Sequence, residues 1–195
     1  MPLQSLAEYE VLAAAAHGHL CAGQILGLRM ALHGMALLGI DDPAGTDRKR
    51  LLSVVEIDRC ITDAIGVVTG CRLGKRALKF RDFGKTAATF CDLRENRAVR
   101  IAARESAKDR ARALYPEIAE RNQQQMRAYR EMPDEELFQV AWVRVTFGAE
   151  DLPGYKAARV VCAQCGESVS FRREVVREGR VLCRACAGES YYEPT

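Results

Sequence analysis

Four cysteines near the carboxyl end restrict the fold of this chain more than any other feature. They form two Cys-x2-Cys pairs with seventeen residues between them, at Cys162, Cys165, Cys183 and Cys186. Each pair suits a tight turn, and two such turns direct four thiolates at one cation, which completes the closed tetrahedral shell of a structural zinc. We therefore expect a Zn2+ ion here. Because about forty residues bury little apolar surface, its binding should supply most of the local folding free energy.

The residues around these cysteines indicate a small zinc-finger domain of the treble-clef kind. Short strands are expected at 169–171 and 180–182, and a helix at 184–189 would carry the last ligand. A filled shell leaves no open coordination position, so we assign no catalysis to it. Two surface pairs, Arg172-Arg173 and Tyr191-Tyr192, are of a type that contacts nucleic acid. Three glutamates are interleaved with them, which favours docking of a protein or stabilisation of a dimer.

Length and composition bound the rest of the chain. A chain of 195 residues with 48% apolar and 28% charged residues has the material for one medium domain and a small appendage. The best boundary is the turn at 151–154, which separates an α+β core, residues 1–152, from the zinc-finger domain, residues 155–195. The net charge of +3 is spread along the chain and gives no reason to expect nucleic acid.

No segment predicts a membrane span or a secretion signal. The longest apolar stretch, residues 25–40, is interrupted by Arg29 and His33, and Glu8 and Glu10 lie where a signal peptide is apolar. We therefore expect a cytoplasmic protein, in which the eight cysteines are thiols or metal ligands rather than disulfides.

The first 150 or so residues predict an α+β domain with a mixed or antiparallel sheet. Helices are expected at 3–16, 22–38, 60–70 and 105–131, with a short one after Pro133, and strands at 51–57, 77–82, 86–93, 98–102 and 142–147. The strands at 77–82 and 86–93, joined by a turn at Gly84, suggest antiparallel neighbours. The glycines of the 22–38 helix would let another backbone approach it closely.

A second cluster of metal-binding residue types lies near the amino end. His17, His19 and Cys21 alternate, so in an extended segment their side chains point to the same side. Cys21 directly precedes the predicted 22–38 helix, and Cys60 begins the next one. A helix N-terminus favours the thiolate through its dipole and its unpaired N–H groups. Two such thiolates with imidazoles beside them would form a mixed N/S site in the core for a second Zn2+ or another transition metal.

The chemistry of this core site has more than one form. Three protein ligands and a water would make it open and catalytic, with His19, Cys21 and Cys60 as the reacting residues. Without metal, Cys21 beside His19 would be an activated nucleophile or a redox thiol. Cys71 is equally consistent with a ligand and with a buried apolar residue, whereas Cys91, on a predicted strand, is expected to be a buried thiol.

Two Gly-Lys pairs offer a contact for an anion or a cofactor. Lys75 and Lys85 each follow a glycine, and such pairs can present an ammonium and free backbone N–H groups to an anion. Neither segment contains the complete phosphate-loop pattern, so surface turns are the simpler interpretation.

Four segments and the cysteine module occur in an order that is typical of one family. The segments are His17-Gly18-His19-Leu20-Cys21-Ala22-Gly23-Gln24-Ile25-Leu26-Gly27, Cys60-Ile61-Thr62-Asp63-Ala64-Ile65, Thr69-Gly70-Cys71-Arg72-Leu73-Gly74-Lys75 and Asp82-Phe83-Gly84-Lys85. Together they resemble the FmdE family, which takes its name from formylmethanofuran dehydrogenase. The resemblance spans most of the chain.

This resemblance implies an α+β core followed by a treble-clef zinc finger, a homodimer, and a metal-binding cleft. On the matching positions the cleft would be lined by His19, Cys21 and Cys60, with His17 and Cys71 as further candidates. Family members are associated with molybdenum or tungsten enzymes, so an enzyme of that kind is the expected partner. The family has proline where this chain has alanine after Cys21, which leaves the start of the helix less rigid.

Three functions stay open at the level of sequence. The first is an FmdE-like accessory metal-binding protein in the assembly or metabolism of a molybdenum or tungsten enzyme. The second is a free-standing metal- or thiol-dependent enzyme that acts on a small molecule. The third is a zinc-finger adaptor or nucleic-acid binder whose core only dimerises.

Overall fold

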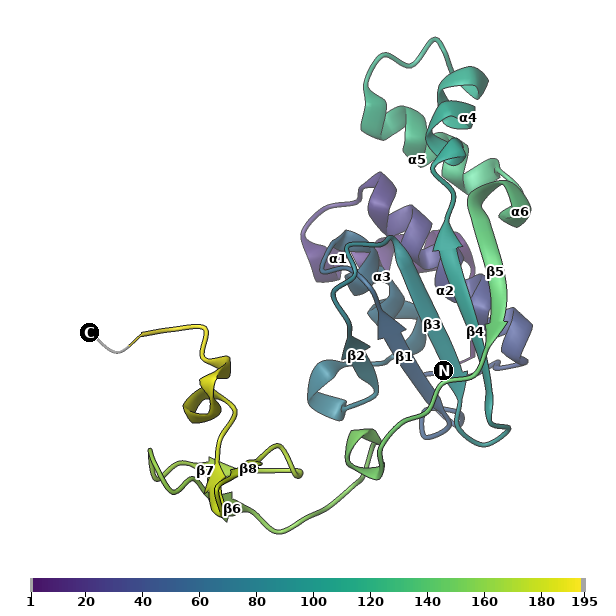
Figure 1. Ribbon diagram of the computed structural model, residues 1–195. Helices are drawn as coiled ribbons and strands as arrows, with labels where there is room; N and C mark the ends of the chain where they lie inside the picture. The colour runs from purple at the N-terminus through teal and green to yellow at the C-terminus, as the bar shows by residue number, and fades with distance from the viewer. Residues whose placement is uncertain (1, 194–195) are drawn as a thin grey trace. The chain divides into compact units, whose positions relative to one another are not determined.

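The computed structural model describes residues 2–193 and divides into two compact units, residues 1–145 and 146–195. The elements of the first unit are α1 (Leu6–His17), α2 (Ala22–Leu38), β1 (Leu51–Val55), α3 (Cys60–Thr69), the short 3-10 helix η1 (Leu73–Lys75), β2 (Leu78–Phe80), β3 (Ala87–Asp92), β4 (Arg97–Ala103), α4 (Ser106–Leu114), α5 (Arg121–Glu131), α6 (Asp134–Leu137) and β5 (Phe138–Val143). Helices α1, α2 and α3 lie on one face of a single sheet (Figure 1). This arrangement confirms the expected α+β class.

The strands described in the first unit follow the order β2-β1-β3-β4-β5. β1 and β2 are parallel and are joined through α3, while the other neighbours are antiparallel. The expected pairing of β2 with β3 is therefore wrong, because β1 lies between them. The segment that joins them runs past the end of β1, where the Arg81 N–H donates to the Val55 carbonyl and the Phe83 N–H donates to the Glu56 carbonyl.

Helix α2 is the buried centre of the first unit. Ile25, Leu28 and Met35 on this helix are fully buried. Gly27 lets α3 come close, because a Cβ atom at this position would lie only 2.6 Å from the Ile61 carbonyl oxygen. The expectation that the glycines of this helix admit a neighbouring backbone is thus confirmed at Gly27. The contact sets the spacing between the amino ends of α2 and α3.

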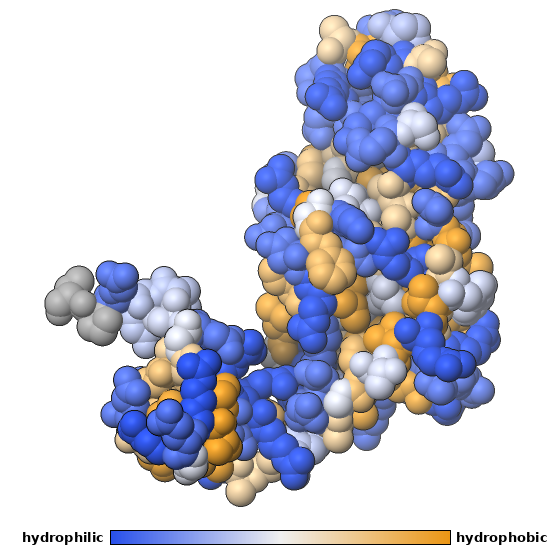
Figure 2. All heavy atoms as spheres, viewed as in Figure 1, coloured by the Kyte–Doolittle hydropathy of each residue, from blue (hydrophilic) through white to orange (hydrophobic). Residues whose placement is uncertain are grey.

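The polar segment after β4 forms two helices, so the single helix expected over 105–131 is wrong. Pro116 lies between α4 and α5; proline has no N–H and disfavours helical backbone in the residue before it. That residue, Tyr115, ends α4 with φ −131° and ψ 59°. The surface over α4 and α5 is largely hydrophilic (Figure 2), as the sparse apolar residues of this segment suggest.

The last strand of the sheet begins earlier than expected. β5 covers Phe138–Val143 rather than 142–147, and its register pairs Phe138 with Ala103 and Val143 with Ala98 of β4. Phe138 is buried, so the position of the strand follows from the core contact of its first residue. None of the helices described in residues 2–193 has the length and apolar content needed to cross a membrane.

The second unit consists of short elements around the cysteines. They are η2 (Ala149–Asp151), β6 (Val160–Val161), β7 (Ser168–Val169), β8 (Val175–Arg177), β9 (Arg180–Leu182) and the helical turn η3 (Ala185–Glu189). β6 pairs with β7 and β8 pairs with β9, both antiparallel. Glu178 and Gly179 between β8 and β9 have φ values of 49° and 74°, as a tight hairpin turn requires. The strand expected at 180–182 is confirmed.

Candidate functional site

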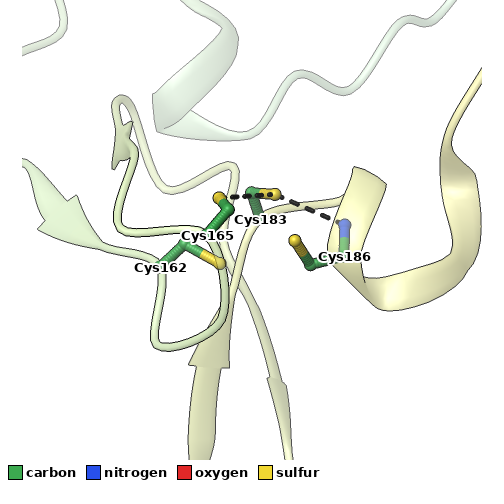
Figure 3. A group of neighbouring side chains, drawn as sticks. All are labelled: Cys162, Cys165, Cys183 and Cys186. Carbon is green, nitrogen blue, oxygen red and sulfur yellow. Dashed lines mark hydrogen bonds between the residues drawn. The ribbon is translucent and has the colours of Figure 1, made fainter. Parts of the chain in front are cut away.

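The four C-terminal cysteines converge on one point (Figure 3). Their sulfur atoms all lie within 4.8 Å of one another, and the sulfurs of Cys165 and Cys183 are 3.9 Å apart. A tetrahedral zinc with bonds of about 2.3 Å separates its sulfur ligands by about 3.8 Å, so these side chains fit a zinc ion. Among residues 2–193, this is the one group of three or more His, Cys, Asp or Glu with ligand atoms gathered so closely.

Short turns place these sulfurs. Cys162 follows β6, and its N–H donates to the Glu167 carbonyl at 2.9 Å. The Gly166 N–H donates back to the Cys162 carbonyl at 3.0 Å, and Gly166 has φ 77°, a conformation that favours glycine. Cys183 follows β9, and Cys186 lies in η3, so the helical turn carries the last ligand as expected.

The electrostatics of this cluster suit a cation. Backbone N–H groups, from Cys165, Cys183 and Gln164 in that order, lower the pKa of Cys162 to about 6. The hydrogen bond with Cys183, followed by burial and the other thiols, raises the pKa of Cys186 to about 12. Because thiolates repel one another, the cluster resists full ionisation until a divalent cation neutralises it.

Cys21 and Cys60 meet at the amino ends of two packed helices. Cys21 is the N-cap residue of α2, and Cys60 is the first residue of α3. Their thiols form a hydrogen bond. A Cβ atom at Gly23 would lie 3.4 Å from Cys60 Cβ and 3.8 Å from Cys21 Sγ, so glycine leaves space beside the pair. The structure therefore brings together two thiols that are 39 positions apart in the sequence.

The protonation of Cys60 differs from the expectation for a thiol at a helix N-terminus. Burial, followed by the hydrogen bond with Cys21, raises the pKa of the Cys60 thiol. Desolvation and a second thiol therefore outweigh the helix dipole, whose effect is modest beside that of burial. Cys60 accordingly favours the neutral thiol when no cation is bound to the pair.

His17 and His19 lie on the segment that leads into α2. His17 is the last residue of α1, and Gly18 follows with φ 92°, which turns the chain. Nδ1 of His17 is 2.8 Å from Oδ2 of Asp63, and the ring centroids of His17 and His19 are 4.9 Å apart. Asp63 stands three residues after Cys60, so both face the same side of α3. Helix α3 thus contacts this segment twice, through a thiol and through a carboxylate.

Two neighbours of the core cluster were not predicted as site residues. Asp63 has a sequence signal, since it lies one helical turn after Cys60. Asn122, on α5, has none: its Oδ1 accepts from the Ala22 N–H at 2.8 Å across a separation of 100 residues. This bond satisfies one of the free N–H groups at the start of α2, beside Cys21.

Cys71 is not brought to the pair. It follows the carboxyl end of α3, and a helix of ten residues separates its two ends by about 15 Å. Its sulfur faces the Leu51 carbonyl at the start of β1, and its side chain is buried. Cys91 is buried as well, and burial, followed by the effect of Cys71, raises its pKa to about 12. Of the two interpretations of Cys71, a buried thiol fits this position.

Lys75 and Lys85 are exposed, on η1 and on the segment between β2 and β3. Their backbone N–H groups are already used, by the Arg72 carbonyl for Lys75 and by the Glu56 carbonyl for Lys85, both at 3.2 Å. An anion at either lysine would therefore find the ammonium but not the N–H of the same residue.

Comparison with protein families gives two matches. Residues 16–139 match the family described as "FmdE, Molybdenum formylmethanofuran dehydrogenase operon". Residues 156–192 match the family described as "Prokaryotic dksA/traR C4-type zinc finger", which covers all four C-terminal cysteines. The first match includes both helices that carry Cys21 and Cys60.

Two individual proteins are similar to the chain. The crystal structure of an FmdE-like protein of tungsten formylmethanofuran dehydrogenase, from Syntrophus aciditrophicus, superposes with a TM-score of 0.66 at 20% identity, over 99% of this chain and 100% of that one. At this identity the likeness shows a shared fold. A "Probable S-adenosyl-L-methionine-binding protein" from Archaeoglobus fulgidus is 32% identical over 200 residues. That match covers 90% of this chain but 51% of the relative, so the chain spans about half the length of that protein.

Proposed function

The chain belongs to the FmdE family, and on that premise we propose that it is an accessory metal-binding protein with a second metal site in its core. The observation that carries this proposal is the contact between Cys21 and Cys60 at the start of α2 and α3. The C-terminal cysteines hold a structural zinc, and the core site would hold a zinc or another transition metal that can exchange.

The residues around the pair fit such a metal. Two sulfurs and the imidazole nitrogens of His17 and His19 form a mixed N/S ligand set of the kind that zinc and similar ions prefer. The raised pKa of Cys60 is consistent with this role, because a divalent cation would offset both the burial and the neighbouring thiol. His19 is exposed, so its ring is free to turn toward the pair.

We propose that this site serves the metabolism of a molybdenum or tungsten enzyme. The support is the description of the family, which names the operon of molybdenum formylmethanofuran dehydrogenase, together with the like fold of the Syntrophus protein. An enzyme of the formylmethanofuran dehydrogenase type is then the partner to test, and the cytoplasm, where thiols stay reduced, is the compartment we propose.

Metal content tests the core site directly. The full chain should bind two metal ions, and Cys21→Ser with Cys60→Ser should reduce this to one, measured by inductively coupled plasma mass spectrometry. Cys71→Ser is the matched control and should leave both ions, since Cys71 lies beyond the other end of α3. One ion in the unaltered chain, unaffected by the double substitution, would refute the core site.

A dithiol function is the second candidate, favoured by the hydrogen bond between the two thiols. A small-molecule disulfide would take two electrons from Cys21 and Cys60, whose S–H bonds break as an S–S bond forms and two protons leave with the reduced thiols of the oxidant. Such a pair would serve a thiol-dependent enzyme that acts on a small molecule. Incubation with oxidised glutathione should lower the mass by about 2 Da in the unaltered chain but not in Cys21→Ser.

We propose that the protein is a homodimer, which the family resemblance implies. β5 is an edge strand, and it exposes Val140 by 38% and Trp142 by 54%. Large apolar side chains on an open edge are typical of an interface. Sedimentation equilibrium should give twice the chain mass, and Trp142→Lys should give monomers with unchanged metal content. A monomeric unaltered chain would contradict this.

A further inference from the structure

The contact between His17 and Asp63 joins the end of α1 to the first turn of α3. Nδ1 of His17 and Oδ2 of Asp63 are 2.8 Å apart, and the side chain of Asp63 is 60% exposed against 19% for His17. Asp63 also lies one turn from Cys60 on the same side of α3. The carboxylate and the thiol therefore reach the segment that contains His17 and Cys21 from one helix face.

We propose that Asp63 is a positioning residue for the core site, an inference that rests on the proposed metal site at Cys21 and Cys60. A carboxylate only accepts hydrogen bonds, so His17 donates through Nδ1–H, and this assigns the lone pair of the ring to Nε2. The ring is then held with Nε2 available as a ligand. Carboxylates that orient metal-binding histidines in this way make the ring a better ligand.

Two simpler roles would produce the same contact. Asp63 could stabilise α3 as an acidic residue in its first turn, or it could attract a cation through its charge without acting on His17. The first role affects folding and leaves metal affinity alone. The second weakens metal binding whether or not His17 is present. Orientation of His17 predicts loss of affinity only when His17 is present.

Titration of the full chain with Co2+ after the C-terminal site is filled with zinc separates these roles. Asp63→Ala should weaken Co2+ binding at the core site by about tenfold or more and change the Co2+ absorption bands, with an unchanged melting temperature. Asp63→Asn, which keeps an acceptor oxygen, should restore part of the affinity. Asp58→Ala is the matched control, because Asp58 is exposed and lies five residues away on the same connection into α3.

A double-mutant cycle with His17→Asn decides the mechanism. Asp63→Ala should have no further effect on Co2+ affinity in the His17→Asn chain. An equal loss in both backgrounds would overturn the proposal and assign the effect to charge. Unchanged Co2+ affinity in Asp63→Ala, with two metals in the unaltered chain, would overturn it while leaving the core site intact. A single metal in the unaltered chain would overturn both.

Discussion

At the scale of single residues, the buried charges of the core are paired within the sheet. The Asp92 side chain is fully buried and forms two hydrogen bonds with Arg50. Glu56, which is also buried, forms two bonds of 2.7 Å with Arg100. A buried carboxylate is tolerated only with such partners, because its desolvation is otherwise costly. The acid stability of the core should therefore depend on these pairs.

We expect Asp92→Asn to destabilise the core and to reduce its response to acid. Burial alone would raise the pKa of Asp92, but the hydrogen bonds from Arg50 and from the backbone of Glu95 and Arg94 outweigh burial, and the pKa is lowered. A lowered folded-state pKa gives stability that is present above about pH 4, the unfolded value for aspartate, and that is lost as the pH falls through the folded value.

Urea unfolding from about pH 7 down to about pH 3 measures this effect. Asp92→Asn should cost about 3 kcal/mol at neutral pH, since it leaves Arg50 without its charged partner. Its free energy of unfolding should fall less steeply below about pH 4 than that of the unaltered chain. Asp58→Asn, an exposed control, should follow the unaltered chain. Parallel acid curves for all three would contradict the assignment.

At the scale of elements, the core site depends on how closely α2 and α3 pack. The contact is made where α2 has no side chain, at Gly27, against the backbone at Ile61 and the methyl group of Ala64. Since Cys21 lies six residues before Gly27 and Cys60 one residue before Ile61, a change in helix spacing would separate the two thiols. Packing and site geometry are therefore a single property of this helix pair.

Gly27→Ala should destabilise the core by about 2 kcal/mol or more. Its Cβ would lie 2.6 Å from the Ile61 carbonyl oxygen and 2.8 Å from Ala64 Cβ, which outweighs the gain of about 1 kcal/mol in helix propensity. Gly74→Ala is the control, because nothing lies within 4 Å of its Cβ and its φ is not positive, and it should change stability by less than about 0.5 kcal/mol. Equal thermal melting of both variants would refute the close approach.

At the scale of the whole molecule, the two units are held together by different forces. The first has an extensive apolar core that includes Ile25, Leu28 and Phe90. The buried apolar residues of the second are Cys162, Leu182 and Ala187, with a few partly buried neighbours. So small a cluster cannot offset the entropy of ordering the chain, so the second unit should depend on its metal.

Removal of zinc should therefore unfold the second unit and leave the first folded. With excess chelator, trypsin should cut within residues 156–192 many times faster, while thermal melting of the core should stay the same. Cys186→Ser should behave in the same way, because it removes one of the four ligands. Unchanged protease resistance after complete loss of zinc would contradict this dependence. The boundary at 151–154 stays a prediction that the first cleavage sites would test.

Features with short sequence spacing were predictable from the chain alone. The cysteines form a compact cluster because the members of each pair lie on a single tight turn, and the helix over 22–38 has the observed bounds. The capping box of Ser5 and Glu8 also forms, with both hydrogen bonds present. One local signal was overlooked: Pro116 ends the helix expected over 105–131, for reasons that act within one turn of chain.

Features that join distant segments required the tertiary structure. The sequence alone determined which residues can bind metal and which stretches form helices, because backbone preference and ligand spacing act over a few residues. Only packing decided that β1 lies between β2 and β3, that Cys71 is carried to the far end of α3, and that Asn122 reaches the start of α2. Such contacts follow from how buried surfaces fit together, which no local pattern encodes.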